Sequence, residues 1–429
     1  MDASVSSKAN PKSTFEANVR EIVTARYVRA AEPSDAVGGA RPSLVVEPGN
    51  EQELARILKL ANAAGLALIP RGGGTKLEWG NRPTNADVIL STVRMHRVIE
   101  HAWADLTVSV EAGCTIAKLQ ETVAKHKQRL ALDALWPEQA TVGGVLSTND
   151  SGALRLRFGS LRDLVIGVTV ALADGTVASS GGKVVKNVAG YDLPKLVTGA
   201  FGTLGVITRA IFRLHPLPQE TRTISCLTAD AAEGQQLMLA IQNSKLAHSA
   251  LQICCGTEMQ SRVDVLFEGT EEGLSAQSVQ LKLMASEAKQ GDRTGNVWNR
   301  RHELWLETKK SGEFAVAKFA ALPAQIAETV EMMEMVVAAP LRWSAVAQAT
   351  GIGWVRMDGG ASEIAAAMLG LREWLEGKGG SLAIVRRPEG MAEIDAWGKP
   401  GDALGLMQAV KRQFDPIGTL NPGRLVGGI

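Results

Sequence analysis

The sequence predicts an α+β fold in which two domains share the chain. Its 429 residues exceed the ~100 to 200 residues of one ordinary core. Strand-like alternation and helix-like periodicity both occur in each half of the sequence. The segment His215-Pro216-Leu217-Pro218 stops a strand and predicts a domain boundary near residue 220.

Composition narrows the class of protein. Hydrophobic residues make up 45% and charged residues 21%, which is typical of globular chains with buried cores. The 46 basic and 45 acidic residues leave a formal net charge of +1, so no bulk positive field attracts nucleic acid. The 4 cysteines lack C-x-x-C spacing, which favours a reducing compartment and argues against a zinc or iron–sulfur site held by this chain alone. Without an apolar signal segment or an ~18-residue apolar span, we expect a cytoplasmic protein.

The first elements lead to a glycine-rich loop. Residues 1–14 are small and polar and predict a disordered tail. Asn50 begins a capping pattern, and apolar residues at helical spacing then predict a helix that ends at Gly65. The apolar run 66–69 predicts a short strand. It ends in Pro70-Arg71-Gly72-Gly73-Gly74-Thr75, where three consecutive glycines prevent either regular structure from continuing.

Further strands complete the N-terminal half. Alternation followed by helical spacing predicts a strand and a helix within 106–123. A second glycine-bearing stretch, 136–152, has little periodicity and predicts irregular structure. Residues 164–177 predict two strands joined by an Asp-Gly turn, and 206–214 predict another strand.

The C-terminal half predicts a second α+β domain and a closing segment. Residues 221–384 mix helix-like and strand-like runs and contain no comparable glycine-rich loop. Residues 385–429 include one helix with an apolar stripe, which ends before Asp415-Pro416. The stripe consists of Ala403, Leu406, Met407, Val410 and Phe414.

The first glycine-rich loop predicts an anion site. Glycines let backbone N–H groups approach an anion closely, because no Cβ stands in the way. Arg71 adds a permanent positive charge with paired donors, which suits a diphosphate. A mobile surface turn is the alternative for one isolated Arg-Gly-Gly-Gly segment. Neither the P-loop spacing nor the Rossmann Gly-x-Gly-x-x-Gly spacing fits, because Thr75-Lys76 is in the reverse order and Leu77 occupies the third glycine position.

Six sequence blocks together carry a resemblance to a known family. The chain resembles the vanillyl-alcohol-oxidase (PCMH) type of FAD-linked oxidoreductases, and within it the FAD-binding subunits of bacterial glycolate oxidases. The six blocks occur in family order. They are Pro70 to Thr75, Thr141 to Asn149, Gly159 to Leu164, Lys186 to Leu193, Gly202 to Thr208 and Asn421 to Arg424.

The resemblance implies the domain plan and the cofactor. It implies a two-subdomain PCMH-type FAD-binding domain over 15–220, an inserted α+β cap or substrate domain over 221–384, and a C-terminal segment, 385–429, that returns to the FAD domain. Covalent flavin attachment in this family often uses a histidine just after the glycine run, where this chain has Thr75, so the resemblance implies non-covalent FAD. The implied FAD-binding residues are Pro70, Arg71, Gly72, Gly73, Gly74, Thr75, Pro137, Thr141, Val142, Gly143, Gly144, Asn149, Ser151, Gly152, Gly205, Val206, Ile207 and Asn421.

The resemblance also implies partners. These are a second flavin subunit, an iron–sulfur subunit and a small 2-hydroxy acid substrate, with any membrane association made through the partner subunits. No nucleic acid is expected.

Candidate catalytic residues lie in the second domain. Oxidation of a 2-hydroxy acid needs a cation for the carboxylate and a base for the hydroxyl proton. Trp298, Arg301, His302 and Trp305 are spaced to share one helix face, with Arg301 as the clamp and His302 as the base. On this assignment Arg301→Ala leaves the flavin content unchanged. A helix whose tryptophans pack in a core is the alternative.

Three functional hypotheses remain open at this level. The first is the flavoprotein subunit of a glycolate dehydrogenase complex that passes electrons to an iron–sulfur partner. The second is a self-sufficient FAD-dependent oxidoreductase on another alcohol or hydroxy acid, and the third is a non-catalytic structural subunit. The 6 histidines are scattered without metal-ligand spacing, so we expect no metal site.

Overall fold

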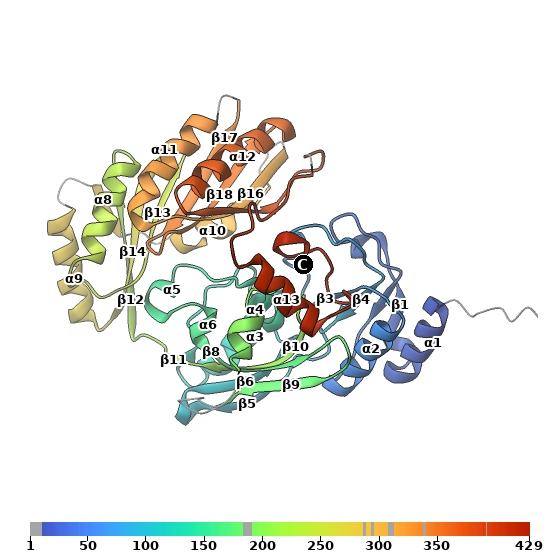
Figure 1. Cartoon of the computed structure of the whole chain (residues 1–429). Helices are drawn as coiled ribbons and strands as arrows, with labels where there is room; N and C mark the ends of the chain where they lie inside the picture. The colour runs from blue at the N-terminus through green and yellow to red at the C-terminus, as the bar shows by residue number, and fades with distance from the viewer. Residues whose placement is uncertain are drawn as a thin grey trace, which may run out of the picture.

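The chain folds around three sheets that mix with helices (Figure 1). The computed structural model describes residues 11–182, 191–285, 289–292, 296–307, 313–337, 340–391 and 393–429. Within these residues a four-stranded, a five-stranded and an eight-stranded sheet follow one another, and a two-stranded ladder joins β7 (Gln128–Arg129) to β11 (His215–Pro216). The architecture confirms the α+β class. Residues 1–10 of the predicted tail and 186–190 of the fourth family block lie outside the described residues.

The four-stranded sheet carries the first glycine-rich loop. Its order is β1 (Val28–Ala30), β2 (Leu44–Val46), β4 (Val88–Ser91) and β3 (Leu68–Arg71), with β2, β4 and β3 parallel. Helix α2 (Glu51–Ala63) begins after Asn50, whose side chain accepts the N–H of Glu53 at 2.9 Å. Its buried residues are those of the predicted stripe, so this helix and the strand before the loop are confirmed. They are Leu54, Ile57, Leu58 and Ala61.

Helix α1 (Pro11–Val23) corrects the predicted disordered tail. Phe15, Val19 and Val23 recur at four-residue spacing and are buried against the core of the first sheet. Pro11 stands in the first turn, where its missing N–H costs no hydrogen bond. Residues 11–14 are therefore helical, because the helix that buries this stripe extends one turn ahead of Phe15.

The five-stranded sheet is antiparallel and stacks beside the first. Its order is β5 (Val98–Ala102), β6 (Thr107–Glu111), β10 (Val206–Arg213), β8 (Val165–Ala171) and β9 (Val177–Gly181). The β8–β9 pair is the predicted hairpin, with Ala171 opposite Val177. Around it lie α3 (Ile116–Ala124), α4 (Val142–Thr148), α5 (Arg155–Phe158), α6 (Leu161–Leu164) and α7 (Leu193–Val197).

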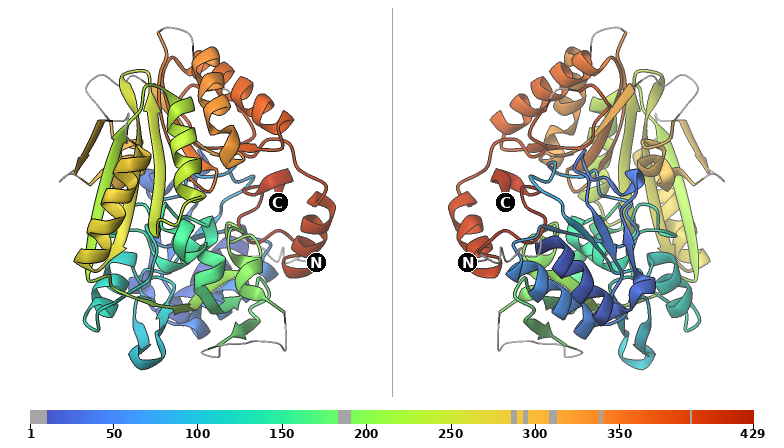
Figure 2. Two further views of the ribbon diagram at one scale, coloured as in Figure 1. Left: turned by 90° about the vertical axis from the view of Figure 1, so that its left-hand side faces the viewer. Right: turned by 90° about the vertical axis from the view of Figure 1, so that its right-hand side faces the viewer.

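The eight-stranded antiparallel sheet forms the second half of the molecule. Its order is β15 (Lys289–Asp292), β12 (Glu220–Leu227), β14 (Met259–Gly269), β13 (His248–Gly256), β17 (Arg342–Gln348), β18 (Ile352–Gly359), β16 (Glu313–Ala320) and β19 (Ser381–Arg386). One face is covered by four helices (Figure 2). These are α8 (Ala231–Gln242), α9 (Glu271–Met284), α11 (Ile326–Val336) and α12 (Ala361–Gly377).

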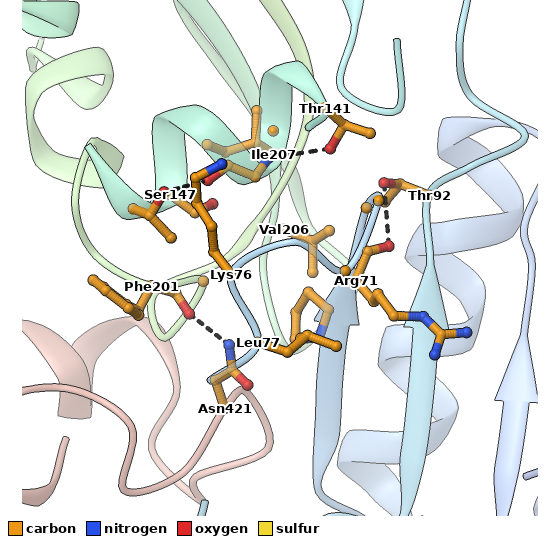
Figure 3. A pocket seen from close by; sticks show the side chains of 18 of the residues that line it. Arg71, Lys76, Leu77, Thr92, Thr141, Ser147, Phe201, Val206, Ile207 and Asn421 are labelled. Atoms are coloured by element: carbon orange, nitrogen blue, oxygen red, sulfur yellow. Dashed lines mark hydrogen bonds between the residues drawn. The ribbon is translucent and has the colours of Figure 1, made fainter. Parts of the chain in front are cut away.

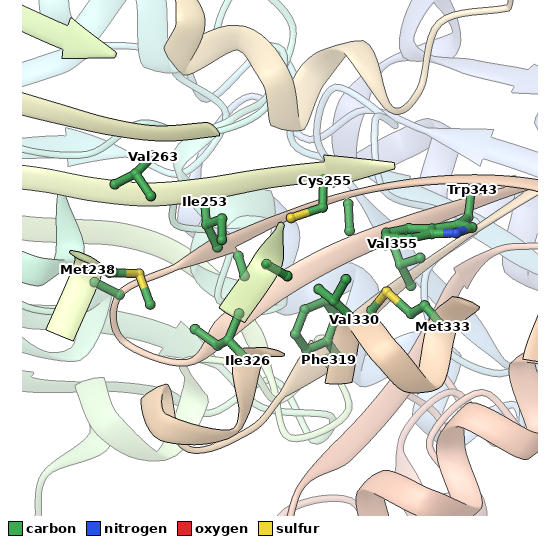
Figure 4. Close-up of a cluster of buried hydrophobic side chains, with 14 of the residues drawn as sticks. Met238, Ile253, Cys255, Val263, Phe319, Ile326, Val330, Met333, Trp343 and Val355 are labelled. Carbon is green, nitrogen blue, oxygen red and sulfur yellow. The ribbon is translucent and has the colours of Figure 1, made fainter. Parts of the chain in front are cut away.

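The main hydrophobic core lies between these helices and the large sheet. Met238 of α8 and Met333 of α11 meet Ile253 and Phe319 from the strands there (Figure 4). All four are almost fully buried. The opposite face of the sheet carries polar and aromatic side chains and packs on the N-terminal half through η4 (Val297–Asn299) and α10 (Arg300–Glu303).

The C-terminal segment returns to the first sheet. Helix α13 (Leu404–Phe414) is followed by a turn in which the N–H of Leu68 donates to the carbonyl of Thr419 at 2.7 Å. The N–H of Asn421 in turn donates to the carbonyl of Leu68 at 2.9 Å, and this bond holds Asn421 beside the glycine-rich loop. The helix predicted to end before Asp415 is confirmed, and the residues of its apolar stripe are exposed or half-buried, with Leu406 70% exposed. Within the described residues, no helix combines the length and apolar character needed to cross a membrane.

Candidate functional site

A cleft of about 710 Å³, open solvent at its mouth included, lies where the first two sheets meet the C-terminal segment (Figure 3). It is lined by the end of β3 and the loop after it, by α4, by the turn before β10, and by the returning tail. The lining residues are Pro70 to Leu77, Thr92, Thr141, Gly143, Gly144, Ser147, Thr148, Phe201, Gly202, Gly205, Val206, Ile207, Asn421 and Arg424.

The glycine-rich loop offers a run of free donors to this cleft. In the described part of the chain, the backbone N–H groups of five successive residues, Gly72 to Lys76, donate to no protein acceptor. Gly73 is exposed and Gly72, Gly74 and Thr75 are half-buried, so these N–H groups are accessible to a ligand in the cleft. Successive amides that line a concave surface form an anion site, and phosphate oxygens are typical guests. The glycines of this row are the residues from which the sequence predicts an anion site.

Two of the glycines are required by a close approach of two loops. A Cβ on Gly73 would lie 1.8 Å from the carbonyl oxygen of Gln139, and one on Gly72 would lie 2.0 Å from Oγ1 of Thr141. Neither glycine has a positive φ. Their need is therefore steric, because the glycine-rich loop packs directly on the segment that begins α4.

The second glycine-bearing stretch, 136–152, contributes fewer free backbone N–H groups to the cleft than the first glycine-rich loop. It contains helix α4, although its sequence predicts irregular structure. Thr141 caps that helix and accepts the N–H of Gly144 at 3.4 Å, and the N–H of Gly143 donates to Ala112 at 2.8 Å. The free backbone N–H groups at the cleft therefore come mainly from the first glycine-rich loop.

Two polar residues of the tail each have one buried atom without a hydrogen-bond partner at the cleft. Asn421 donates to the carbonyl of Phe201 at 2.5 Å, while its buried Oδ1 has no donor in the described residues. Arg424 is 3% exposed and donates through Nη2 to the carbonyl of Trp79 at 2.6 Å, and its Nε has no acceptor there. Burial and the neighbouring charge of Arg387 lower the pKa of Arg424 to about 10. These unpaired atoms suit a ligand with both polar and anionic groups.

The structure corrects the predicted role of Arg71. Its Nη1 donates to Oδ1 of Asp35 at 2.6 Å, and the same carboxylate also accepts from Arg29. The guanidinium points away from the cleft (Figure 3). Only the stem of Arg71 lines the cleft, so the phosphate-binding charge that the sequence predicts is neutralised within the protein. The pKa of Asp35 is strongly lowered by its hydrogen bond to Arg29.

Most of the predicted FAD-binding residues line this cleft, and a few do not. Pro137, Val142, Asn149, Ser151 and Gly152 lie outside the lining; Val142 is buried in the core of the second sheet. The lining residues that the sequence missed are Lys76, Leu77, Thr92, Ser147, Thr148, Phe201, Gly202 and Arg424. All of these except Leu77 and Thr92 belong to a recognised block or directly adjoin one, which is the signal that could have identified them.

Of the four residues predicted to share one helix face, Trp298 is separated from the rest, whereas Arg301 and His302 share the aromatic neighbours Trp354 and Trp136 with Trp305. A 3-10 turn passes into the four-residue helix α10 there, so the helical spacing over 298–305 fails. The indole of Trp298 donates to Thr223 at 3.1 Å, whereas Arg301 donates to Oδ1 of Asp150 at 2.7 Å. Arg301 also donates to the carbonyls of Asp133 and Ser151, so its guanidinium is committed within the protein. His302 lies beside Trp136 and is not among the residues that line the cleft.

Lys318 of β16 lies close to this ion pair. Its Nζ is 5.5 Å from the ring centroid of Trp354. Burial, opposed by Asp150 and reinforced by Arg301, lowers the pKa of Lys318 to about 8. Among the described residues, no group of three or more His, Cys, Asp or Glu side chains is arranged to hold a metal ion.

The lowered pKa of Lys318 predicts a pH-dependent stability. Its pKa is about 8 in the folded chain against 10.5 for a free lysine, so the unfolded state binds more protons between these pH values. Stability due to this group therefore rises as the pH increases from about 8 to 10.5. Lys318→Met should melt above the parent chain at pH 7, and the gap should close by about pH 10.5. Thermal melts across this range, with the exposed Lys125→Met as control, check this; a gap independent of pH contradicts it.

Comparison with known proteins agrees with the geometry. Residues 42–181 match the family described as FAD binding domain. The glycolate oxidase subunit GlcD of Bacillus subtilis is 33% identical over 211 residues, 49% of this chain and 45% of that protein. The D-lactate dehydrogenase of Archaeoglobus fulgidus is 38% identical over 185 residues, 43% of this chain and 41% of that protein. The match thus spans less than half the length of these two relatives.

The fold has close counterparts among solved structures. The crystal structure of p-cresol methylhydroxylase with substrate bound matches with a TM-score of 0.76 at 16% identity, over 97% of both chains. The free amides of the glycine-rich loop and the unpaired atoms of Asn421 and Arg424 fit the anionic and polar groups of FAD. The chain therefore carries an FAD-binding domain and has the fold of the vanillyl-alcohol-oxidase (PCMH) type of FAD-linked oxidoreductases.

Proposed function

We propose that the chain is the FAD-binding subunit of a 2-hydroxy acid oxidoreductase complex, of the glycolate oxidase kind. The observation that carries the proposal is the row of free amides from Gly72 to Lys76 at the cleft, within the matched FAD-binding region. The relatives named for glycolate and D-lactate support a small 2-hydroxy acid as substrate. We assign 15–220 and 385–429 to the FAD domain and 221–384 to the cap.

Different residues of the chain are assigned to different parts of FAD. We assign the amides of Gly72 to Lys76 to the diphosphate, Val206 and Ile207 to the adenine end, and Asn421 to the flavin end. When bound, FAD would supply the hydride acceptor for oxidation of a hydroxyl carbon to a carbonyl. That oxidation releases two electrons and two protons, and we assign onward electron transfer to an iron–sulfur partner. A second flavin subunit would complete the complex.

One observation favours the alternative of a non-catalytic structural subunit. Arg301, the predicted carboxylate clamp, is sequestered in an ion pair with Asp150. Trp79, Trp305 and Trp354 pack against one another beside it. This packing leaves the predicted catalytic cation unavailable to a substrate. A self-sufficient oxidoreductase on another alcohol would need a different cation.

Arg424 should contribute to FAD affinity. A buried cation without a carboxylate partner is costly to desolvate, and an anionic ligand offsets that cost. We expect Arg424→Met to weaken FAD binding by about tenfold, which corresponds to ~1.4 kcal/mol. Calorimetric titration of the flavin-free chain measures this, with Arg412→Met on the exposed side of α13 as control. Equal affinities for the two variants would contradict the assignment.

The flavin should be released without breaking a covalent bond. Thr75 stands where the family resemblance implies a flavin-linking histidine, and a threonine hydroxyl offers no comparable nucleophile. We expect acid precipitation of the purified chain to leave all flavin in the supernatant. Flavin fluorescence that stays with the precipitated protein contradicts this expectation.

Two measurements separate the functional alternatives. Copurification of the tagged chain, followed by identification of bound subunits, should recover a second flavin subunit and an iron–sulfur protein. A steady-state assay with glycolate or D-lactate and an artificial acceptor should then show turnover for the complex and none for the isolated chain. Turnover by the isolated chain indicates a self-sufficient enzyme. A complex whose turnover survives loss of FAD from this chain indicates a structural subunit.

A further inference from the structure

A buried carboxylate joins the two halves of the molecule next to the cofactor cleft. Asp150 is 0% exposed. Its Oδ1 accepts from Nη1 of Arg301 at 2.7 Å, and its Oδ2 lies 3.3 Å from Nζ of Lys76. The N–H of Leu135 donates to Oδ2 at 2.9 Å. Although burial opposes it, the charges of Arg301 and Lys76 hold the pKa of Asp150 below its usual value.

The three charged residues of this cluster, Lys76, Asp150 and Arg301, come from three separate segments of the chain. Lys76 is the last residue of the row of free amides that begins at Gly72 and lines the cleft. Asp150 follows α4, which forms another wall of the same cleft. Arg301 belongs to the second half of the molecule, on the face of the large sheet opposite the four helices. One carboxylate therefore connects both cleft-lining segments to the cap.

Tryptophan rings flank the two cations that pair with Asp150. Nζ of Lys76 lies 5.4 Å from the ring centroid of Trp136 and 5.7 Å from that of Trp79. The guanidinium of Arg301 lies 5.5 Å from the ring centroid of Trp354. In such surroundings a buried ion pair holds its geometry tightly, because breaking it leaves an uncompensated charge.

We propose that Asp150 is a positioning residue through which Arg301 of the cap sets the affinity for FAD, although Arg301 lines no part of the cleft. Arg301 holds Asp150, and Asp150 holds Lys76 at the end of the loop whose amides bind the diphosphate. The proposal rests on the FAD site and is independent of the substrate. It reverses the sequence-based expectation that loss of Arg301 leaves the flavin content unchanged.

A double-mutant cycle on the full chain tests this relay. FAD is titrated into the flavin-free parent, Asp150→Asn, Arg301→Met and the double variant, with binding followed by calorimetry. We expect each single variant to bind FAD about 5- to 20-fold more weakly, within the usual range of coupling between sites. In the Asp150→Asn background, Arg301→Met should change the affinity by less than about twofold, because its partner is already lost.

A matched control separates positioning from general stability. Asp264 is also 0% exposed and is paired with Arg262 at 2.7 Å, but both lie on β14 within the large sheet. Asp264→Asn should lower the melting temperature while leaving FAD affinity within about twofold of the parent. If Asp150→Asn does not fold, Arg301→Met against Asp264→Asn decides the question.

Three results would overturn the proposal. One is parental FAD affinity in Arg301→Met. Another is multiplication of the two single effects in the double variant, which would mean that Arg301 acts without Asp150. The third is an equal loss of affinity in Asp264→Asn, which would mean that any buried ion pair of the sheet has the same effect. Failure of the proposed substrate assignment changes none of these readouts.

Discussion

Gly73→Val is expected to purify without FAD. The new Cβ would lie 1.8 Å from the carbonyl oxygen of Gln139, a distance at which the backbone must move. Moving it separates the glycine-rich loop from the segment that begins α4 and displaces the row of free amides. We expect the affinity for FAD to fall by more than about 100-fold, or ~3 kcal/mol. The flavin absorbance per chain, together with titration of the flavin-free protein, measures the effect.

Two further glycine variants serve as comparisons for Gly73→Val. Gly269→Val on β14 meets no atom within 4 Å and should keep its flavin, which controls for valine as such. In Gly144→Val the Cβ meets only Oγ1 of Thr141, at 3.3 Å, so the side chain should extend into the cleft and displace FAD without separating the loops. Stoichiometric flavin in both Gly73→Val and Gly144→Val would show that the diphosphate lies elsewhere.

Asp415→Ala is expected to cause the largest loss of stability. Its carboxylate is 2% exposed and accepts the N–H groups of Thr419 and Leu420 at 2.9 and 2.7 Å. It also pairs with Nζ of Lys411 at 2.6 Å. Removing it leaves two buried amides unpaired. It also leaves the Lys411 ammonium without a counter-charge, although that group keeps its hydrogen bonds to the carbonyls of Thr203 and Leu420. We expect a decrease of about 3 kcal/mol in the free energy of unfolding.

Urea unfolding of the flavin-free chain measures this decrease. Asp402→Ala is the matched control, because Asp402 is exposed just before the same helix and should change the free energy by less than about 0.5 kcal/mol. The same Asp415→Ala change should also weaken FAD binding, since the turn it closes carries Asn421 to the cleft. An unfolding midpoint equal to that of the control contradicts this account of the tail.

Local patterns in the sequence were sufficient to predict helix α2, the strand before the glycine-rich loop and the hairpin, but not β1, β2 and β4 of the first sheet. Asn50 and the buried stripe of α2 act within a few residues of each other, so their spacing shows the helix directly. The same holds for the Asp-Gly turn between β8 and β9. The glycine-rich loop is also local, because three consecutive glycines at the end of a strand leave few alternatives. For the cleft, the recognised blocks supplied the remaining walls.

Contacts between distant residues explain what the sequence could not predict. Arg71 pairs with Asp35, and Arg301 pairs with Asp150 across 151 positions of the chain. Neither partner can be identified from spacing, so two charges predicted for ligands proved to be committed within the protein. Helix α4 could not be predicted from the sequence either, because its two glycines weaken the helical pattern. The helix is stabilised by its cap, Thr141, and by the packing of Val142 and Leu146.

A crystal structure of the chain with FAD tests the central claim most directly. The account predicts the diphosphate oxygens within hydrogen-bonding distance of the backbone N–H groups of Gly72 to Lys76, with the flavin ring toward Asn421 and Arg424. A diphosphate held by side chains at another surface, with these amides still facing solvent, would contradict it.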